Sequence, residues 1–118
     1  MKGVTLRTSS CKAKGRRLQD AVAKSLQETY TSLRDGDIKV AIMGESGRDI
    51  GLSPAAEDVI PFDIECKNQQ KIAIWAALEQ AESNKKEGRI PLVIFKRNHS
   101  KTYAVIEWER LLELLAKK

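Results

Sequence analysis

Residues 62–68 read FDIECKN, a short stretch in which charged and apolar side chains alternate. Because successive side chains of a strand point to opposite faces, Asp63, Glu65 and Lys67 share one face. The opposite face is apolar and is predicted to be core, with Phe62, Ile64 and Cys66 on it. The charged face has two explanations: a solvated edge strand, where lysine is common, or a functional site.

The segments on both sides of this strand favour a site. Residues 38–43 alternate and are rich in branched side chains, and residues 48–52 form a short returning strand after a turn at 44–47. Beyond FDIECKN, residues 70–85 have helical spacing, and the continuous apolar run 91–95 is typical of a strand covered on both faces. A strand followed by a helix and a buried strand is predicted to pair inside the sheet, where a row of charges is better explained by function.

The rest of the chain supplies further helices and one more strand. Residues 15–33 carry apolar side chains at helical spacing, and residues 53–57 resemble a capped helical turn with Pro54 at its first position. Residues 102–106 are predicted to form a strand and residues 108–115 an amphipathic helix. The order α-β-β-β-α-β-β-α predicts an α/β fold with a mixed sheet flanked by helices.

Length and charge bound the organisation of the chain. A length of 118 residues suits one domain, which is predicted over residues 15–118. The net charge of +5 is local, because residues 1–17 hold six basic side chains and no acid. Residues 1–14 are predicted to be a basic flexible arm. Charge alone leaves open whether this arm keeps the protein soluble or binds the phosphates of nucleic acid.

Composition also argues against several classes of protein. No apolar run approaches the length that spans a bilayer, and the basic start of the chain is not followed by the apolar segment of a signal peptide. Two distant cysteines and a single histidine give neither a disulfide framework nor a zinc site. We therefore expect a cytoplasmic protein with no membrane contact and no small-molecule cofactor.

The acidic residues near FDIECKN indicate which ion such a site would bind. Asp49 lies in the preceding short strand, where strand pairing would bring its carboxylate beside Glu65. Two carboxylates next to the ammonium of Lys67 suit Mg²⁺, which binds through one or two carboxylates and substrate phosphate. Asp58 is an alternative to Asp49, because it is closer to Glu65 in sequence but lies in a loop.

At this point the chain resembles a known family. Asp49, fifteen further residues and then Glu65-Cys66-Lys67, within the order α-β-β-β-α-β, resemble the PD-(D/E)XK nuclease superfamily. The run IECKNQQKIAIWAALEQAE, followed by PLVIFKRN, is similar to small phage-type members related to Holliday-junction resolvases and virus-type repair (VRR-NUC) nucleases. The resemblance covers roughly residues 15–106. It implies a restriction-endonuclease-like αβββαβ core with an extra strand and a C-terminal helix.

The resemblance also implies an activity and roles for single residues. The chain would be a Mg²⁺- or Mn²⁺-dependent endonuclease that hydrolyses DNA phosphodiester bonds, on branched or structured DNA. Asp49, Glu65 and the backbone carbonyl of Cys66 would bind the metal ion. Lys67 would orient or deprotonate the attacking water, and Gln80 of the following helix would contact phosphate or position Lys67. Alternatives are a nuclease for single strands or nicked duplexes, a catalytically weak DNA-binding module, and a role in RNA processing.

Two positions depart from the family pattern. Arg48 stands where the family has a proline before its first aspartate, and Gln19 replaces an acidic residue often found on the first helix. Gln19 and Asp63 are expected to lie close behind the metal ligands. Basic residues on both sides of the site are expected to contact nucleic acid: Lys12, Lys14, Arg16, Arg17, Arg48, Lys96, Arg97, His99 and Lys101.

A homodimer is predicted, because symmetric cleavage of two strands needs two sites and small oligomers are most often two-fold symmetric. The C-terminal helix offers a surface. Its stripe of Trp108, Leu111, Leu112 and Leu115 is assigned to the core of the domain, together with Trp75 of the preceding helix. Leu114 falls outside this stripe and is predicted to meet the second copy.

Overall fold

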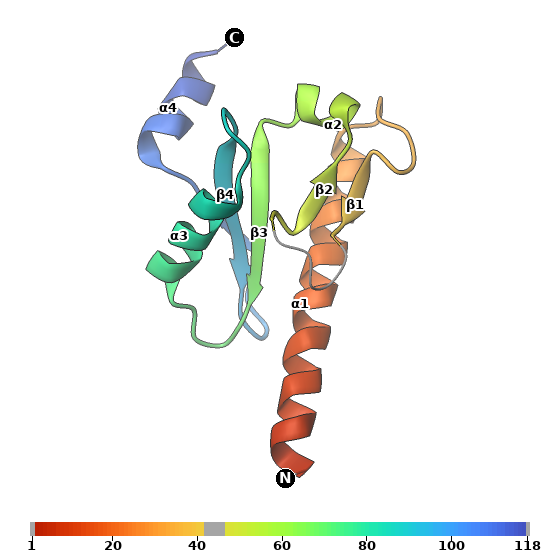
Figure 1. The fold of residues 1–118 in the computed structure, drawn as a ribbon, viewed down its shortest axis with the longest axis vertical. Coiled ribbons are helices and arrows are strands. Elements are labelled where there is room, and N and C mark those ends of the chain that lie inside the picture. Colours follow the sequence, from red (N-terminus) through yellow and green to blue (C-terminus); the bar gives the residue numbers. More distant parts are fainter. Residues whose placement is uncertain (1, 42–46, 118) are drawn as a thin grey trace.

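The fold is that of an α/β protein in which two small sheets lie among four helices (Figure 1). The computed structural model describes residues 2–41 and 47–117, with side chains from residue 12 onward. The order of helices and strands is the predicted one, with the expected helical turn as a short helix α2. The elements are α1 (Lys2–Thr29), β1 (Ile38–Val40), β2 (Ile50–Leu52), α2 (Pro54–Val59), β3 (Phe62–Asn68), α3 (Ile74–Asn84), β4 (Ile90–Lys96), β5 (Tyr103–Val105) and α4 (Trp108–Ala116).

Strand β3 is the FDIECKN strand, and it lies inside the array of strands. It pairs in parallel with β4, with Glu65 opposite Val93, and β4 pairs in the antiparallel sense with β5. On its other side β3 meets the chain just before β2, where Asp49 N–H donates to the Ile64 carbonyl at 2.9 Å. Strands β1 and β2 form a separate antiparallel pair. The mixed sheet is confirmed, and β3 is not a solvated edge.

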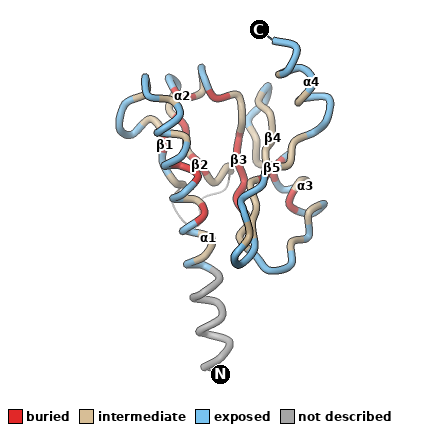
Figure 2. The backbone as a smooth tube through the Cα atoms, turned by 180° about the vertical axis from the view of Figure 1, so that it is seen from behind, coloured by how far each residue is buried: buried red, intermediate tan, exposed pale blue. Residues whose placement is uncertain are grey.

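The apolar face of β3 packs under α1, as predicted. Ile64 and Cys66 belong to one buried cluster with Leu18 and Val22 of α1, and Leu92 and Ile94 of β4 pack against it. Ser53 caps α2 by accepting from Ala56 N–H at 3.1 Å, which holds that short helix against the same cluster. Figure 2 shows buried residues running along β3 and the neighbouring part of α1.

The opposite face of the sheet packs under α3. Ala77 and Ala81 are buried against Val93 of β4, with Phe95 and Val105 at the edge of this second cluster. Since Glu65 and Val93 are opposite each other in the parallel ladder, the charged residues of β3 lie on the α3 face. The alternation in FDIECKN therefore separates the α1 core from a polar layer beneath α3.

The N-terminal helix is longer than predicted. It begins at Lys2 rather than at residue 15, so residues 2–14, expected to form a flexible arm, have a helical backbone that extends past the sheet (Figure 1). This stretch contains no proline, and Gly15 inside a helix costs only about 1 kcal/mol relative to alanine. The predicted turn at 44–47 falls mostly on residues outside the described part of the chain. None of the described helices is long and apolar enough to cross a bilayer.

The C-terminal helix presents a different side to the domain than the sequence suggested. Leu111 and Leu114 of α4 are half-buried, whereas Trp108, Leu112 and Leu115 are exposed. The assignment of Trp108 and Trp75 to the core is wrong, because their exposed fractions are 65% and 77%. Spacing along a helix defines an apolar side but does not reveal whether the domain reaches that side.

Candidate active site

Asp49 joins β2 to β3 and places a carboxylate at their junction. Its N–H donates to the Ile64 carbonyl, and its Oδ2 accepts from Cys66 N–H at 2.7 Å. In a strand, the N–H and the carbonyl of one residue point to the same side. The carbonyl of Cys66 therefore points toward Asp49, which is the orientation that a metal-binding role requires.

Glu65 is a buried acid next to Cys66, whose N–H binds the Asp49 carboxylate. Only 2% of Glu65 is exposed, and its Oε1 accepts from Asn84 Nδ2 at 2.9 Å. Burial raises the pKa of Glu65 to about 7, against the lowering effect of the Asn84 hydrogen bond; the charge of Asp49 raises it further and Lys67 lowers it. Two nearby carboxyl groups do not both ionise readily where little water reaches them.

Lys67 lies two residues further along β3, on the same face as Glu65. Its Nζ donates to Gln80 Oε1 at 2.7 Å. Gln80 and Asn84 are four residues apart on α3, so they occupy one side of that helix, while Glu65 and Lys67 occupy one side of β3. The strand and the helix are thus joined by two side-chain hydrogen bonds, Lys67 to Gln80 and Asn84 to Glu65.

Asn84 is a site residue that the sequence analysis missed. Its position four residues after Gln80 was the available signal, because a residue one turn beyond a site residue lies on the same side of a helix. The predicted residues Asp49, Glu65, Lys67 and Gln80 are brought together by the structure. Their catalytic roles remain predictions.

The donor set fits a small divalent cation. Asp49 and Glu65 offer hard carboxylate oxygens, and an adjacent cation would offset the burial and the charge of Asp49 that raise the pKa of Glu65. Among the described residues, no group of three acidic, histidine or cysteine side chains converges. Two carboxylates and a carbonyl are nevertheless sufficient for Mg²⁺, which keeps water and substrate phosphate in its remaining positions.

Asp63 does not support the metal ligands and has a structural role instead. Its Oδ1 accepts from Arg48 Nη1 and from Arg89 Nε, both at 2.7 Å, and its Oδ2 accepts from Lys86 N–H at 2.8 Å. Burial acts to raise the pKa of Asp63, but the Lys86 N–H and the two guanidinium groups outweigh it and keep the pKa below its usual range. The expectation that Asp63 lies behind the metal ligands is therefore corrected.

Arg48 also has a structural role. Its guanidinium contacts Asp63, Glu57 at 2.8 Å and the Leu52 carbonyl at 3.1 Å, and only 12% of its side chain is exposed. These contacts use the guanidinium inside the fold, and the predicted contact of Arg48 with nucleic acid stays a prediction. They also give a physical reason for arginine where the family has proline, because the arginine connects α2 to β3.

The remaining candidates lie outside the cluster. Gln19 is half-buried on α1, next to Leu18 of the core, and within the described parts of the chain no hydrogen bond joins it to Asp49 or Glu65. Asp58 is exposed on α2, so the geometry favours Asp49 as the partner of Glu65. The thiol of Cys66 points into the core under α1, where burial raises its pKa.

The other basic residues gather at the end of the sheet from which Lys67 emerges. Asn68, the next residue, donates to the Lys14 carbonyl of α1 at 2.9 Å and is opposite Lys96 of β4. This places the basic turns of α1 beside the β4–β5 connection. Lys14 and Lys96 are half-buried, and the other basic residues at this end are exposed: Lys12, Arg16, Arg17, Arg97, His99 and Lys101.

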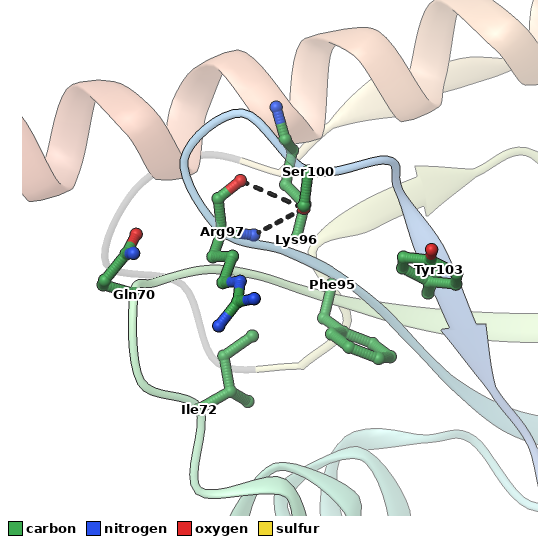
Figure 3. Close-up of a pocket in the computed structure, with 7 residues that line it drawn as sticks. All are labelled: Gln70, Ile72, Phe95, Lys96, Arg97, Ser100 and Tyr103. Atoms are coloured by element: carbon green, nitrogen blue, oxygen red, sulfur yellow. Dashed lines mark hydrogen bonds between the residues drawn. The ribbon is translucent and has the colours of Figure 1, made fainter.

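Two neighbouring hollows open at this end of the sheet. The smaller, of about 160 Å³, lies over Lys67 and Gln80, where Ala73 and Ala76 leave space at the start of α3. The larger, of about 350 Å³, lies over β4 and β5 (Figure 3). Ile72 lines both hollows, so they adjoin one another.

Comparison with known proteins gives no family, since no family model, no curated protein and no solved structure matches this chain. The function is therefore argued from the geometry of the site and the resemblance carried by its motif.

Proposed function

We propose that this protein is a metal-dependent endonuclease of the PD-(D/E)XK type that hydrolyses DNA phosphodiester bonds. One observation carries the proposal: the Asp49 carboxylate is held at the Cys66 N–H, next to the buried Glu65, and Lys67 lies two residues beyond Glu65 on the same face of β3. An acid pair alone would be weak support. The residue types and their order along the chain are those of the resemblance, and they support the proposal.

The ion, Mg²⁺ or Mn²⁺, would be held by Asp49, Glu65 and the Cys66 carbonyl. When bound, it supplies Lewis acidity, stabilising phosphate charge and easing the ionisation of water. One oxygen of Asp49 is already used by Cys66 N–H, so its other oxygen is the one left for the ion. The raised pKa of Glu65 predicts that loading the site releases a proton near neutral pH.

Lys67 would act on the phosphate and the attacking water. A lysine ammonium has three N–H donors, and one is given to Gln80. The two others can donate to a non-bridging phosphate oxygen and to the water, which holds both in line for displacement. Gln80 is then a positioning residue, since it acts through Lys67.

DNA is the proposed substrate because the site opens at the basic end of the sheet. Exposed basic side chains from α1 and from the β4–β5 connection flank Lys67. Clustered basic groups bind phosphate by releasing counterions, whatever the sequence of bases. Branched or structured DNA is proposed from the likeness to junction-resolving and repair nucleases.

A catalytically weak DNA-binding module is the second candidate. The observation in its favour is that Gln19 provides no acid near the pair of carboxylates. Such a module would bind DNA through the same basic end of the sheet but would leave it intact.

A cleavage assay separates the two candidates. Supercoiled plasmid, single-stranded DNA and a four-way junction are incubated with Mg²⁺, with Mn²⁺ or with EDTA. We expect metal-dependent cleavage that is lost in Glu65→Gln and kept in Glu57→Gln, an acid paired with Arg48 and Lys86 away from the site. DNA binding without cleavage under every metal condition would disprove the nuclease and support the DNA-binding module. The cleavage rates on the three DNAs show whether branched or single-stranded DNA is the preferred substrate.

We further propose that the protein is a homodimer, through α4. The half-burial of Leu114 moves the expected contact to the exposed face formed by Trp108, Leu112 and Leu115. Light scattering of wild type and Leu112→Glu tests this: a dimeric mass that becomes monomeric in the variant is expected. A monomeric wild type would disprove the dimer.

A further inference from the structure

A row of three side chains crosses the sheet beside the candidate active site. Lys67 of β3 is opposite Phe95 of β4, and Phe95 is opposite Tyr103 of β5. Directly opposite residues share a face, and Phe95 packs into the α3 cluster, so all three side chains lie on the α3 face. Neighbouring strands are about 4.8 Å apart, which puts Tyr103 roughly 10 Å from Lys67 along the row.

The larger hollow lies over the far end of this row and is called the aromatic pocket here. Its walls combine flat rings with a guanidinium: the rings of Phe95 and Tyr103 have centroids 5.9 Å apart and are tilted by 31°. Figure 3 shows the Arg97 side chain projecting toward Ile72 on one side of the hollow and Tyr103 lying on the other. Lys96 points the other way, toward α1.

The rim of the aromatic pocket is held by the β4–β5 connection. Ser100 Oγ accepts from Arg97 N–H at 3.0 Å, and Gln70 Oε1 accepts from Asn98 N–H at 3.2 Å. His99 adopts a left-handed backbone with φ of 63°, which closes the tight turn. These contacts fix the backbone from which the Arg97 side chain projects into the pocket.

The chemistry of the walls selects a planar ligand that is attached to an anion. More than half of Tyr103 is exposed, with 54% of its surface accessible, so its ring is available for stacking. An aromatic face stacks on any nucleobase, and arginine adds a cation that meets either the π face or a phosphate. Arg97 could also pair with an acidic side chain of a peptide. The adjoining hollow leads to Lys67, where a phosphate is expected, and this favours a nucleotide over a peptide.

We propose that the aromatic pocket binds an unpaired nucleobase of the DNA strand, stacked on Tyr103, while a neighbouring phosphate of that strand lies at Lys67. The inference rests on the proposed function only in taking Lys67 as the phosphate site. A base within a duplex is already stacked and paired, so it cannot enter. The substrate class is thereby narrowed to DNA with an unpaired nucleotide at the point of attack, as at a flap, a gap or the centre of a branch.

Binding without catalysis tests the proposal. Fluorescein-labelled oligothymidylate and an abasic oligomer of the same length, which keeps every phosphate and lacks every base, are titrated in EDTA and followed by anisotropy. Wild type should bind oligothymidylate roughly 10-fold or more tightly than the abasic oligomer, since a stacked base contributes about 1–3 kcal/mol. Tyr103→Leu should remove most of this preference, and Tyr103→Phe should retain it.

The matched control is Trp75→Leu, which removes an exposed aromatic residue of α3 that lines neither hollow. This control variant should keep the full preference for oligothymidylate over the abasic oligomer. In addition, Tyr103→Leu should bind blunt duplex DNA with the affinity of wild type. Equal wild-type binding of the two oligomers would overturn the proposal without use of any variant. So would a preference that survives in Tyr103→Leu. Because cleavage is not measured, base binding by the pocket can be disproved while the proposed nuclease activity holds. Equally, a protein that does not cut DNA can still bind a base in the pocket.

Discussion

Asp63 and Glu65 are neighbours on one face of β3 and are both 2% exposed, yet their surroundings are opposite. Asp63 meets two guanidinium groups and a backbone N–H, which fully compensate its charge. Glu65 meets one neutral amide, from Asn84, and another carboxyl group. A buried acid paired with two arginines is part of the scaffold, whereas Glu65, among the described residues, makes no ion pair and has only the nearby charge of Lys67 to offset a second acid.

The largest expected effect is a difference in cleavage rate between variants of Lys67, near Glu65, and of Lys86, near Asp63. Lys67→Ala is expected to lower the cleavage rate by about 10²–10⁴-fold, because a positioned proton-transfer group contributes that much. Lys67→Arg should not restore the rate, since a guanidinium differs in shape and stays protonated. The control is Lys86→Ala, whose ammonium binds Glu57 in the Asp63 network. Single-turnover cleavage measures both, and a normal rate in Lys67→Ala would remove Lys67 from the site.

The next effect concerns the scaffold. Asp63→Asn should lower the free energy of unfolding by about 3–5 kcal/mol, because it leaves two buried guanidinium groups without their counter-charge. Urea denaturation measures this change. Asp58→Asn, an exposed acid on α2, should change stability by less than about 0.5 kcal/mol. Equal effects of the two variants would show that Asp63 is not the structural member of the pair.

Glu65 should have the reverse effect on stability, which grows as the pH rises above about 4.5. Its folded pKa of about 7 lies above the usual 4.5, so the folded state binds the proton more tightly and loses stability as the pH rises from about 4.5 to about 7. A shift of this size corresponds to roughly 3 kcal/mol. Glu65→Gln should therefore be more stable than wild type at pH 8 by up to about that amount, and equal to it near pH 4.5.

Denaturation in EDTA at both pH values measures the difference, which cancels the titration of all other groups. If the gain in stability of Glu65→Gln over wild type were no larger at pH 8 than at pH 4.5, the pKa of Glu65 would not be raised. Asp63, whose pKa is lowered, stabilises the fold above its unfolded pKa of 3.8 and loses that contribution as the pH falls.

The smallest effect is expected at Asn84. Its hydrogen bond lowers the pKa of Glu65, so Asn84→Ala should raise that pKa and move the alkaline rise of the cleavage rate to higher pH. Loss of a group that orients a metal ligand typically costs about 10–100-fold in activity or metal affinity. Ser83→Ala, an exposed neighbour on α3, is the control. A pH–rate profile at subsaturating Mg²⁺ that is identical for wild type and Asn84→Ala would contradict this role.

The sequence predicted the scaffold well where periodicity determines it. The alternation in FDIECKN located both faces of β3, and the continuous run at 91–95 marked a strand covered by α1 and α3. The cluster of Asp49, Glu65, Lys67 and Gln80 was predictable because a motif fixes residue types at set spacings. Asn84 required one further step along the same helix face.

The rest depended on partners that no local pattern reveals. Asp63 looked like Glu65 in sequence, and only the fold brings Arg89, 26 residues away, to its carboxylate. Arg48 was likewise predicted to contact DNA because its partners, Glu57 and Asp63, are distant in the sequence. The apolar side of α4 was recognised, but which of its leucines would meet the domain depends on the approach of the helix, and Leu114 proved to be the half-buried one.

Asp49 is unlike the other acids in that its backbone N–H and its carboxylate both bond to β3, to Ile64 and to Cys66. The same residue therefore fastens one sheet to the other and supplies an oxygen to the site. Under the proposed nuclease function, a lineage no longer selected for cleavage would keep its fold after substitutions at Lys67 or Glu65, and loss of Glu65 would stabilise the fold above about pH 4.5. Asp49 would still be retained by selection for folding. Inactive descendants of this protein should thus keep their first aspartate long after the glutamate and the lysine have drifted.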